Sequence, residues 1–150
     1  MTLTQIPHCE VYNAQNGIRA RASVVNLDNC LFQNNTVGMF FEEGTATIKK
    51  SVIRTSREVG IHALKSEITI KDSTVSENEW GGVLLDSRKA CINNNNIYNN
   101  GQWELKLEGS DTSDLFTMPN NWWGSTDISK IRVVGPVEIK PILKEPIKTF

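Results

Sequence analysis

The chain lacks the features that mark several large classes of protein. None of its 150 residues belongs to an apolar run long enough to cross a bilayer. The first six residues carry neither the basic region nor the apolar stretch of a secretion signal. Its 16 basic and 17 acidic residues are interspersed and leave a net charge of −1, which excludes the basic stripe that nucleic-acid binding requires. A chain of this length is expected to form one domain.

Cysteine is scarce as well. Cys9, Cys30 and Cys91 are odd in number and do not have the spacing of a zinc site. We expect them to be buried free thiols that act as small apolar side chains. Acidic residues such as Asp28 and Asp72 fall at different positions of the repeat described next, so the sequence predicts no calcium site. We expect no other metal and no cofactor.

Helical periodicity is also missing, and a recurring glycine takes its place. Between residues 17 and 107 no window of about ten residues has the 3.6-residue apolar repeat of an amphipathic helix. Gly17, Gly38, Gly60 and Gly82 are instead spaced by 21, 22 and 22 residues, and each opens a short segment of alternating apolar residues. A period in this range with strand character predicts a solenoid in which each turn stacks on the one before.

Aligning the units on their glycines gives columns of similar residues. Two apolar columns and one small or polar column follow each opening strand: Leu27, Ile48, Ile70 and Ile92; Phe32, Ile53, Val75 and Ile97; Cys30, Ser51, Ser73 and Asn95. Three short strands per unit predict an all-β, right-handed parallel β-helix of about five to six turns, with the polar column forming a hydrogen-bonded ladder. Residues 1–150 then form a single domain, with an incomplete first turn (1–16), repeats (17–107), and a closing turn with a C-terminal cap (108–150).

Asparagine recurs at the expected corners of the solenoid. Turn residues follow the third strand of successive units as Asn34-Asn35, Thr55-Ser56, Glu77-Asn78 and Asn99-Asn100. Asparagine tolerates left-handed backbone, so a corner that repeats it can bend sharply. We interpret the run of four asparagines at 93–96 in the same way, as turn and ladder residues rather than as a ligand site or a low-complexity tract.

The repeat resembles the pectate-lyase-like right-handed β-helices, and among them the carbohydrate-binding and sugar-hydrolase repeat proteins, over residues 11–146. The strand Gly60-Ile61-His62-Ala63 and its equivalents carry the general part of this resemblance. Residues 120–127, which include Trp122 and Trp123, resemble the Asn-x-Trp-Gly block that closes many bacterial and archaeal surface β-helix proteins. The longer acidic connection of that end pattern is reduced here to residues 132–136. The resemblance implies a secreted, periplasmic or cell-surface parent protein, of which this chain is the C-terminal part or a short version.

The outward columns of the opening strands hold the candidate site. One column offers Arg19, His62 and Lys106, and Glu42 and Asp86 lie on the same face. A histidine near carboxylates and cationic side chains is the one arrangement in the sequence that suits acid–base chemistry or binding of a uronate, so His62 is the weak catalytic candidate. The signatures of the enzymes that share the fold, such as Asp-Pro-His of the alginate epimerases and Trp-x-Asp-His of the pectate lyases, are absent.

Tryptophans add two further expectations. Trp122 and Trp123 are predicted to cover the apolar interior at the last turn rather than to stack on sugars. Trp80 and Trp103 fall in corners before opening strands, where an exposed pair would form a better platform for a sugar. The carbohydrate-binding candidates are therefore Arg19, Glu42, His62, Asp86, Lys106, Trp80 and Trp103.

Two functions fit this sequence. The first, which the missing signatures favour, is a non-catalytic module of a surface or exported protein that presents a parallel-sheet face to a polysaccharide or protein. The alternative is the C-terminal part of a polysaccharide lyase or uronan epimerase whose active site lies largely outside this chain. Little sequence precedes the first repeat to cover its strand edges, so we also expect self-association through the N-terminal turn.

Overall fold

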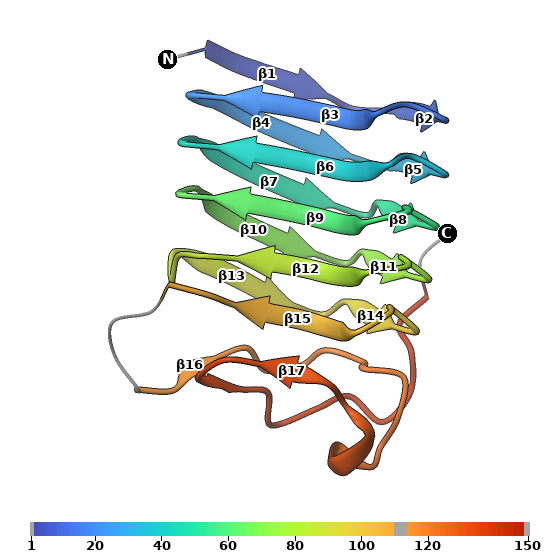
Figure 1. The fold of residues 1–150 in the computed structure, drawn as a ribbon, viewed down its shortest axis with the longest axis vertical. Helices are drawn as coiled ribbons and strands as arrows, with labels where there is room; N and C mark the ends of the chain where they lie inside the picture. The colour runs from blue at the N-terminus through green and yellow to red at the C-terminus, as the bar shows by residue number, and fades with distance from the viewer. Residues whose placement is uncertain (1, 110–113, 149–150) are drawn as a thin grey trace.

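The computed structural model describes residues 2–109 and 114–148, which form a rod of stacked turns. Each turn contributes one strand to each of three parallel sheets, so strands that follow one another in sequence lie in different sheets (Figure 1). The predicted three-sheet, right-handed parallel β-helix of about six turns is confirmed. One short 3₁₀ helix, η1 (Ile128–Lys130), is the helical structure in these residues.

The three sheets are called A, B and C in the order in which the chain visits them. Sheet A consists of β1 (Thr2–Ile6), β4 (Ser23–Asp28), β7 (Thr45–Lys49), β10 (Glu67–Lys71) and β13 (Ala90–Asn93). Sheet B consists of β2 (Cys9–Tyr12), β5 (Cys30–Gln33), β8 (Val52–Arg54), β11 (Thr74–Ser76) and β14 (Asn96–Tyr98). Sheet C consists of β3 (Asn16–Arg21), β6 (Val37–Glu42), β9 (Val59–Leu64), β12 (Gly81–Leu85), β15 (Trp103–Leu107) and β17 (Val133–Val134).

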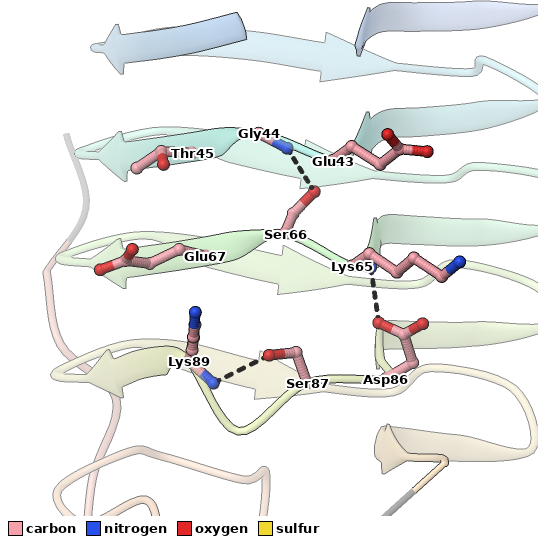
Figure 2. Close-up of a pocket in the computed structure, with 9 residues that line it drawn as sticks. All are labelled: Glu43, Gly44, Thr45, Lys65, Ser66, Glu67, Asp86, Ser87 and Lys89. Carbon is pink, nitrogen blue, oxygen red and sulfur yellow. Dashed lines mark hydrogen bonds between the residues drawn. The ribbon is translucent and has the colours of Figure 1, made fainter. Parts of the chain in front are cut away.

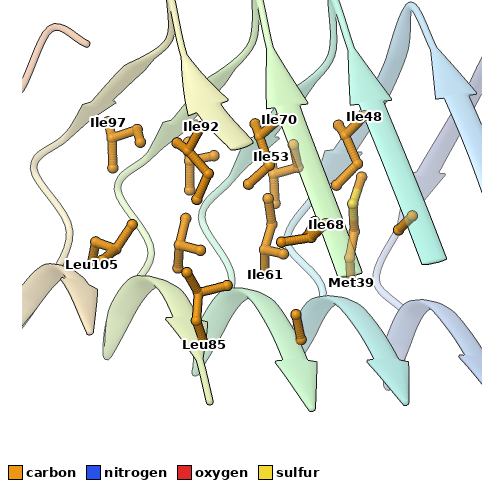
Figure 3. Packing of buried hydrophobic residues seen from close by; sticks show 14 of the residues in the cluster. Met39, Ile48, Ile53, Ile61, Ile68, Ile70, Leu85, Ile92, Ile97 and Leu105 are labelled. Carbon is orange, nitrogen blue, oxygen red and sulfur yellow. The ribbon is translucent and has the colours of Figure 1, made fainter. Parts of the chain in front are cut away.

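The apolar columns line up inside the rod as the sequence predicts. Ile48, Ile70 and Ile92 are register partners on β7, β10 and β13, and each is at most 2% exposed. Figure 3 shows these side chains pointing into a common interior with those of the other two sheets. Burial of one such side chain stabilises the fold by roughly 1.5–3 kcal/mol, so the repeated columns supply most of the driving force.

The recurring glycine is required by close packing between turns. A Cβ atom built on Gly17, Gly38 or Gly82 would overlap the main-chain oxygen of the next residue in the same column. The same atom would also press on a side chain of the corner between sheets B and C, such as the Asn100 amide below Gly82. Glycine therefore recurs because the main-chain oxygen of the next turn, together with a corner side chain, occupies the space that a Cβ would need.

Polar side chains form a ladder at the corner between sheets A and B, which we call the first ladder. The main-chain N–H of each member donates to the side chain of the member one turn later: Cys30 to Ser51 (3.1 Å), Ser51 to Ser73 (3.1 Å), Ser73 to Asn95 (3.0 Å) and Asn95 to Asn121 (3.1 Å). The preceding residue has positive φ in each turn, and it is asparagine at 29, 94 and 120 but lysine at 50 and aspartate at 72. The predicted ladder and corner chemistry of Asn94 and Asn95 are confirmed.

A second ladder follows the corner between sheets B and C. Asn35 Oδ1 accepts a hydrogen bond from the Ala14 N–H (2.9 Å). In later turns the Ser56 N–H donates to Asn78 Oδ1, and the Asn78 N–H donates to Asn100 Oδ1. The last acceptor is the carboxylate of Glu104, which lies 3.0 Å from the Asn100 N–H and 2.9 Å from its side-chain amide. Glu104 occupies the glycine column, so its side chain extends into the place that the next ladder residue would fill.

The three thiols differ in their surroundings. Cys30 is 1% exposed, and its register partner Cys9 is half-buried. Burial, reinforced by the Cys30 thiol, raises the pKa of Cys9 to about 12. Cys91 is exposed, so the expectation of buried thiols is wrong for this residue. Strand alternation explains the difference, because Ile92 points into the rod and its neighbour Cys91 points out.

Residues 114–142 lie mostly at the C-terminal end of the rod, beyond β14 and β15 (Figure 1). A short pair of parallel strands, β16 (Phe116–Thr117) and β18 (Val137–Glu138), lies there, and β17 continues sheet C beyond β15. Met118, Trp123 and Ile139 join the hydrophobic core. The predicted cap over 108–150 stays a prediction, and its residues 110–113 and 149–150 lie outside the described part of the chain.

The chain then returns along the outside of sheet B. The Leu143 N–H donates to the Asn121 oxygen (2.9 Å), and farther on the Asn96 side-chain amide makes two hydrogen bonds to Ile147, accepting from its N–H (2.8 Å) and donating to its C=O (3.0 Å). Asn96 is only 4% exposed. We call residues 143–148 the C-terminal strap.

Candidate functional site

The outward column of sheet C is the candidate site, and the structure aligns it as predicted. Arg19, Phe40, His62, Leu84 and Lys106 are successive register partners on β3, β6, β9, β12 and β15. Because the strands are parallel and in register, the five side chains form one line along the rod. The line runs from a cation through two rings and an apolar residue to a second cation.

Three members of this line are stacked on one another. The guanidinium carbon of Arg19 lies 5.3 Å from the centroid of the Phe40 ring, and the centroid of the His62 ring lies 4.7 Å from that of Phe40 on its other side. The two rings are tilted by 52°. A cation over an aromatic face contributes about 0.5–1 kcal/mol at an exposed site, so the stack is held in place before any ligand binds.

His62 is held toward its neutral form. Burial against its neighbours lowers the pKa of His62, while the Asp86 and Glu108 carboxylates act in the opposite direction with smaller effects. A neutral imidazole carries one hydrogen-bond donor and one acceptor, which suits contacts with hydroxyl groups.

The predicted carboxylates are distributed unevenly around His62. Asp86 and Glu108 are the carboxylates whose charge acts on the imidazole. Glu42 instead pairs in register with Arg21 above and Leu64 below. Of the predicted carboxylates, Asp86 is therefore the one whose charge raises the pKa of His62 against the effect of burial.

Both carboxylates near His62 already have partners. Asp86 Oδ1 accepts a hydrogen bond from the main-chain N–H of Lys65 (2.7 Å), and Glu108 Oε1 lies 3.1 Å from Lys106 Nζ. A general base must reach the proton that it removes, and these contacts compete for the oxygens that would do so. The arrangement offers donors, acceptors and ring faces to a ligand more readily than a free base.

A hollow of about 460 Å³ adjoins Asp86 at the corner between sheets C and A (Figure 2). Figure 2 shows three successive connections lining it, with a hydrogen bond from the Gly44 N–H to Ser66 Oγ (3.3 Å) between the first two. Its lining residues are Glu43, Gly44, Thr45, Lys65, Ser66, Glu67, Asp86, Ser87 and Lys89.

The hollow arises where the corner changes shape. Glu43 and Lys65 turn the chain with φ of 55° and 49°, whereas the equivalent Ser87 does not adopt positive φ. The Lys65 N–H therefore bonds to the Asp86 side chain, while the corresponding Glu43 N–H bonds to the main-chain oxygen of Leu64. Sequence reasoning missed the hollow because residues 86–89 keep the length of the repeat and only their backbone angles depart from it.

The two corner tryptophans do not form an exposed pair. Trp80 is 52% exposed at the start of β12, whereas Trp103 is 9% exposed. A Cβ on Gly81 would overlap the Trp103 ring, so that indole lies directly against the Gly81 backbone. Trp80 and Asp86 thus flank β12 at its two ends, separated by six residues of extended chain, or about 20 Å.

Metal-binding clusters are absent from residues 2–109 and 114–148. In these residues no group of three or more His, Cys, Asp or Glu side chains gathers closely enough to hold a metal ion. The same residues contain no helix with the length and apolar character needed to span a membrane.

Comparison with known proteins bears on the fold. Nothing matched among curated proteins or among solved structures. A family model described as the right-handed beta helix region matches residues 16–122, which cover the repeats from β3 to the Asn96–Trp122 bridge. With the stacked turns described above, this match shows that the chain belongs to the family of proteins with a right-handed β-helix region.

Proposed function

We propose that this protein is a non-catalytic β-helix module that binds a polysaccharide across the outer face of sheet C. The observation that carries the proposal is the line of Arg19, Phe40, His62, Leu84 and Lys106, in which two adjacent rings and an apolar side chain lie between two cations at the spacing of the turns. Sugars present apolar ring faces edged by hydroxyl groups, and such a line matches both.

The flanking features fit an extended ligand. Trp80 is exposed at one end of β12, and the hollow beside Asp86 opens at the other. A polysaccharide that follows β12 covers the span of about 20 Å between them and crosses the line of side chains at Leu84. Lys65 and Lys89 in the hollow supply cations for acidic groups of such a chain.

The partners of the two carboxylates support a binding role over a catalytic one. Asp86 and Glu108 are engaged with Lys65 and Lys106, and the pKa of His62 is lowered. The resemblance to repeat proteins that are mostly secreted supports the further proposal that the parent protein is exported or displayed on a cell surface.

Retention on an array of uronate-containing and neutral glycans tests this proposal, with each glycan also assayed for unsaturated product. Trp80→Ala and His62→Ala are expected to weaken retention by a few-fold to about tenfold, because each removes one stacking surface. Tyr12→Ala is the matched control, since Tyr12 is 45% exposed but lies on sheet B.

Three outcomes oppose the proposal. Retention of no glycan by the unsubstituted chain removes the binding function. Equal retention by Trp80→Ala, His62→Ala and Tyr12→Ala places any binding elsewhere on the rod. Unsaturated product that disappears in His62→Ala replaces the binding module with the alternative, part of a polysaccharide lyase.

A further inference from the structure

Two of the three cysteines lie beside each other on neighbouring turns. Cys9 on β2 and Cys30 on β5 are register partners in sheet B, and these two strands are adjacent in the rod (Figure 1). Register partners on parallel strands are separated by about 4.8 Å between their Cα atoms. Disulfide bonds join residues whose Cα atoms are about 4.4–6.8 Å apart, so the backbone holds this pair at a bonding separation.

The two side chains also point in the same direction. Cys9 and Cys30 both pack against the hydrophobic core, as do the residues two positions later on each strand. Cys30 Sγ lies 3.6 Å from the main-chain oxygen of Ile6. Ile6 belongs to the first turn, so the sulfur of Cys30 reaches back toward the turn that carries Cys9.

The two sulfur atoms are in contact. Burial, and after it the hydrogen bond and the charge of the Cys30 thiol, raise the pKa of Cys9 to about 12. A hydrogen bond between the two thiols means that no other side chain separates them. Cys91 differs, because its register partner on β10 is Thr69.

The pair occupies a column that links successive turns. Cys30 starts the first ladder, in which Ser51, Ser73 and Asn95 each accept a hydrogen bond from the turn before. Cys9 lies in the same column one turn before Cys30. Two thiols at successive places of this column can join their turns covalently, where the later turns are joined by hydrogen bonds.

A hollow on the surface of the rod gives small reagents access to the pair. It has a volume of about 250 Å³, and both cysteines line it, with His8, Asn29 and Arg54 among their neighbours. Cys9 is half-buried, whereas Cys30 is 1% exposed. A reagent in the hollow therefore meets Cys9 first, with Cys30 behind it.

We propose that Cys9 and Cys30 form a disulfide bond between the first two turns when the protein meets a low-molecular-weight disulfide. The Cys9 thiolate attacks one sulfur of the reagent, which leaves a mixed disulfide on Cys9 and releases one thiol. The Cys30 thiolate then attacks the Cys9 sulfur and displaces the second thiol. Two protein thiols are oxidised, the disulfide of the reagent is reduced to two thiols, and the two protons pass through solvent to the released thiols.

The bond acts on the stability of the rod rather than on the candidate sugar site. It closes residues 9–30 into a loop, which restricts the unfolded chain and favours the folded one. Neither cysteine belongs to sheet C, so glycan retention is expected to be the same for the oxidised and the reduced protein. The two proposals can therefore fail independently.

Equilibration in a buffer of reduced and oxidised glutathione tests the bond. The folded, unsubstituted chain is incubated at mildly alkaline pH, because the raised pKa of Cys9 slows attack by its thiolate at neutral pH. Remaining thiols are then alkylated, and the peptides are identified by mass spectrometry. We expect a linked pair of peptides that contain Cys9 and Cys30, with alkylation at Cys91. Alkylation of all three cysteines, or a mixed disulfide at Cys9 without the link, overturns the proposal.

The same equilibrium in concentrated urea shows whether the fold brings the two thiols together. At a fixed glutathione composition, the ratio of linked to unlinked chain is expected to be at least about tenfold higher in the folded protein than in the unfolded one. By linkage, the bond then favours the folded state by the same factor, which raises the urea midpoint of the oxidised chain. Equal ratios in the folded and unfolded chains overturn the proposal.

Serine variants identify the cysteines involved. Cys30→Ser suits the column, because Ser51 and Ser73 occupy its next two places, and we expect it to leave Cys9 without a link. Cys91→Ser is the matched control and is expected to keep the full extent of the link between Cys9 and Cys30. Loss of the link in Cys91→Ser, or an internal disulfide that still forms in Cys30→Ser, overturns the proposal.

Discussion

The two ends of the rod are built differently, and the hydrogen-bond ladders show why. In both ladders a main-chain N–H donates to the side chain of the next turn, except at the Ser56 hydroxyl of the second ladder, which accepts no hydrogen bond in the described residues, so the ladders have a direction. The C-terminal end must therefore supply a final acceptor to each, and it does so with Asn121 and Glu104. At the N-terminal end each ladder begins with a donor N–H, that of Cys30 in the first and that of Ala14 in the second, so no such acceptor is needed there. The direction of the ladders thus places dedicated acceptors at the C-terminal end alone.

The largest expected effect comes from removing apolar side chains at the two ends. Trp123 is 3% exposed in the core at the C-terminal end, so Trp123→Ala should lower the free energy of unfolding by about 3–5 kcal/mol. Val11→Ala, where the side chain is only half-buried, should cost about 1 kcal/mol or less. Denaturant unfolding of both variants measures the difference.

This pair also tests the predicted cap. A cost for Trp123→Ala no larger than that for Val11→Ala would show that the tryptophan does not close the interior. Tyr98→Ala serves as a control for the loss of an aromatic ring near the same end, because Tyr98 is only half-buried on the outer face of sheet B.

The ladder ends give an effect of intermediate size. Asn121→Ala removes the acceptor for the Asn95 N–H (3.1 Å) and the donor to the Ile92 oxygen (3.0 Å), which leaves buried groups unpaired. We expect a loss of about 1–3 kcal/mol in the free energy of unfolding. Asn35→Ala, at the start of the second ladder, should cost less because its partners Ala14 and Val11 lie in the half-buried first turn.

Equal losses for Asn121→Ala and Asn35→Ala would contradict the directional view of the ladders. Thermal and denaturant unfolding should give the same ranking. Asn93→Ala is a suitable control, since Asn93 is half-buried on the outer face of sheet A and belongs to neither ladder.

The smallest expected effect concerns the charge that ends the second ladder. Burial raises the pKa of Glu104. The Asn100 N–H groups and the Arg132 guanidinium lower this pKa, but by less, so the net shift is upward. The folded state therefore holds this proton more tightly than the unfolded state. Its contribution to stability is full below the ordinary glutamate pKa of about 4.3 and is lost as pH rises through the folded pKa.

Glu104→Gln keeps an acceptor for Asn100 but does not titrate. We expect the stability of the variant relative to the unsubstituted chain to increase between acidic and neutral pH. Urea unfolding of both proteins at several pH values measures this trend, and a difference that is constant or falls with pH would contradict it. Glu108→Gln is the control, because Glu108 is exposed.

The repeat made the fold predictable from sequence alone. Glycines at a nearly constant spacing and isoleucines at fixed offsets, such as Ile48 and Ile70, gave the strands, their register and the buried face. The polar column gave the first ladder, because stacked turns leave a small polar side chain no other partner than the adjacent turn.

The rest of the structure depended on exceptions to the repeat. Trp103 is buried by packing against Gly81, and the hollow beside Asp86 follows from one change of backbone angle at Ser87. Neither leaves a trace in residue spacing. Glu104 did leave a signal, since it interrupts the glycine column where no further ladder residue follows.

The C-terminal strap affects how the rod comes apart. Strands of a solenoid contact only their neighbours, so turns can peel from an end one at a time. The two hydrogen bonds between Asn96 and Ile147 are an exception, because they join the C-terminal strap to a turn that does not directly precede it in the chain. Removing the C-terminal strap from sheet B must therefore break two hydrogen bonds to the buried Asn96 side chain, which ties the stability of the last residues to that of β14.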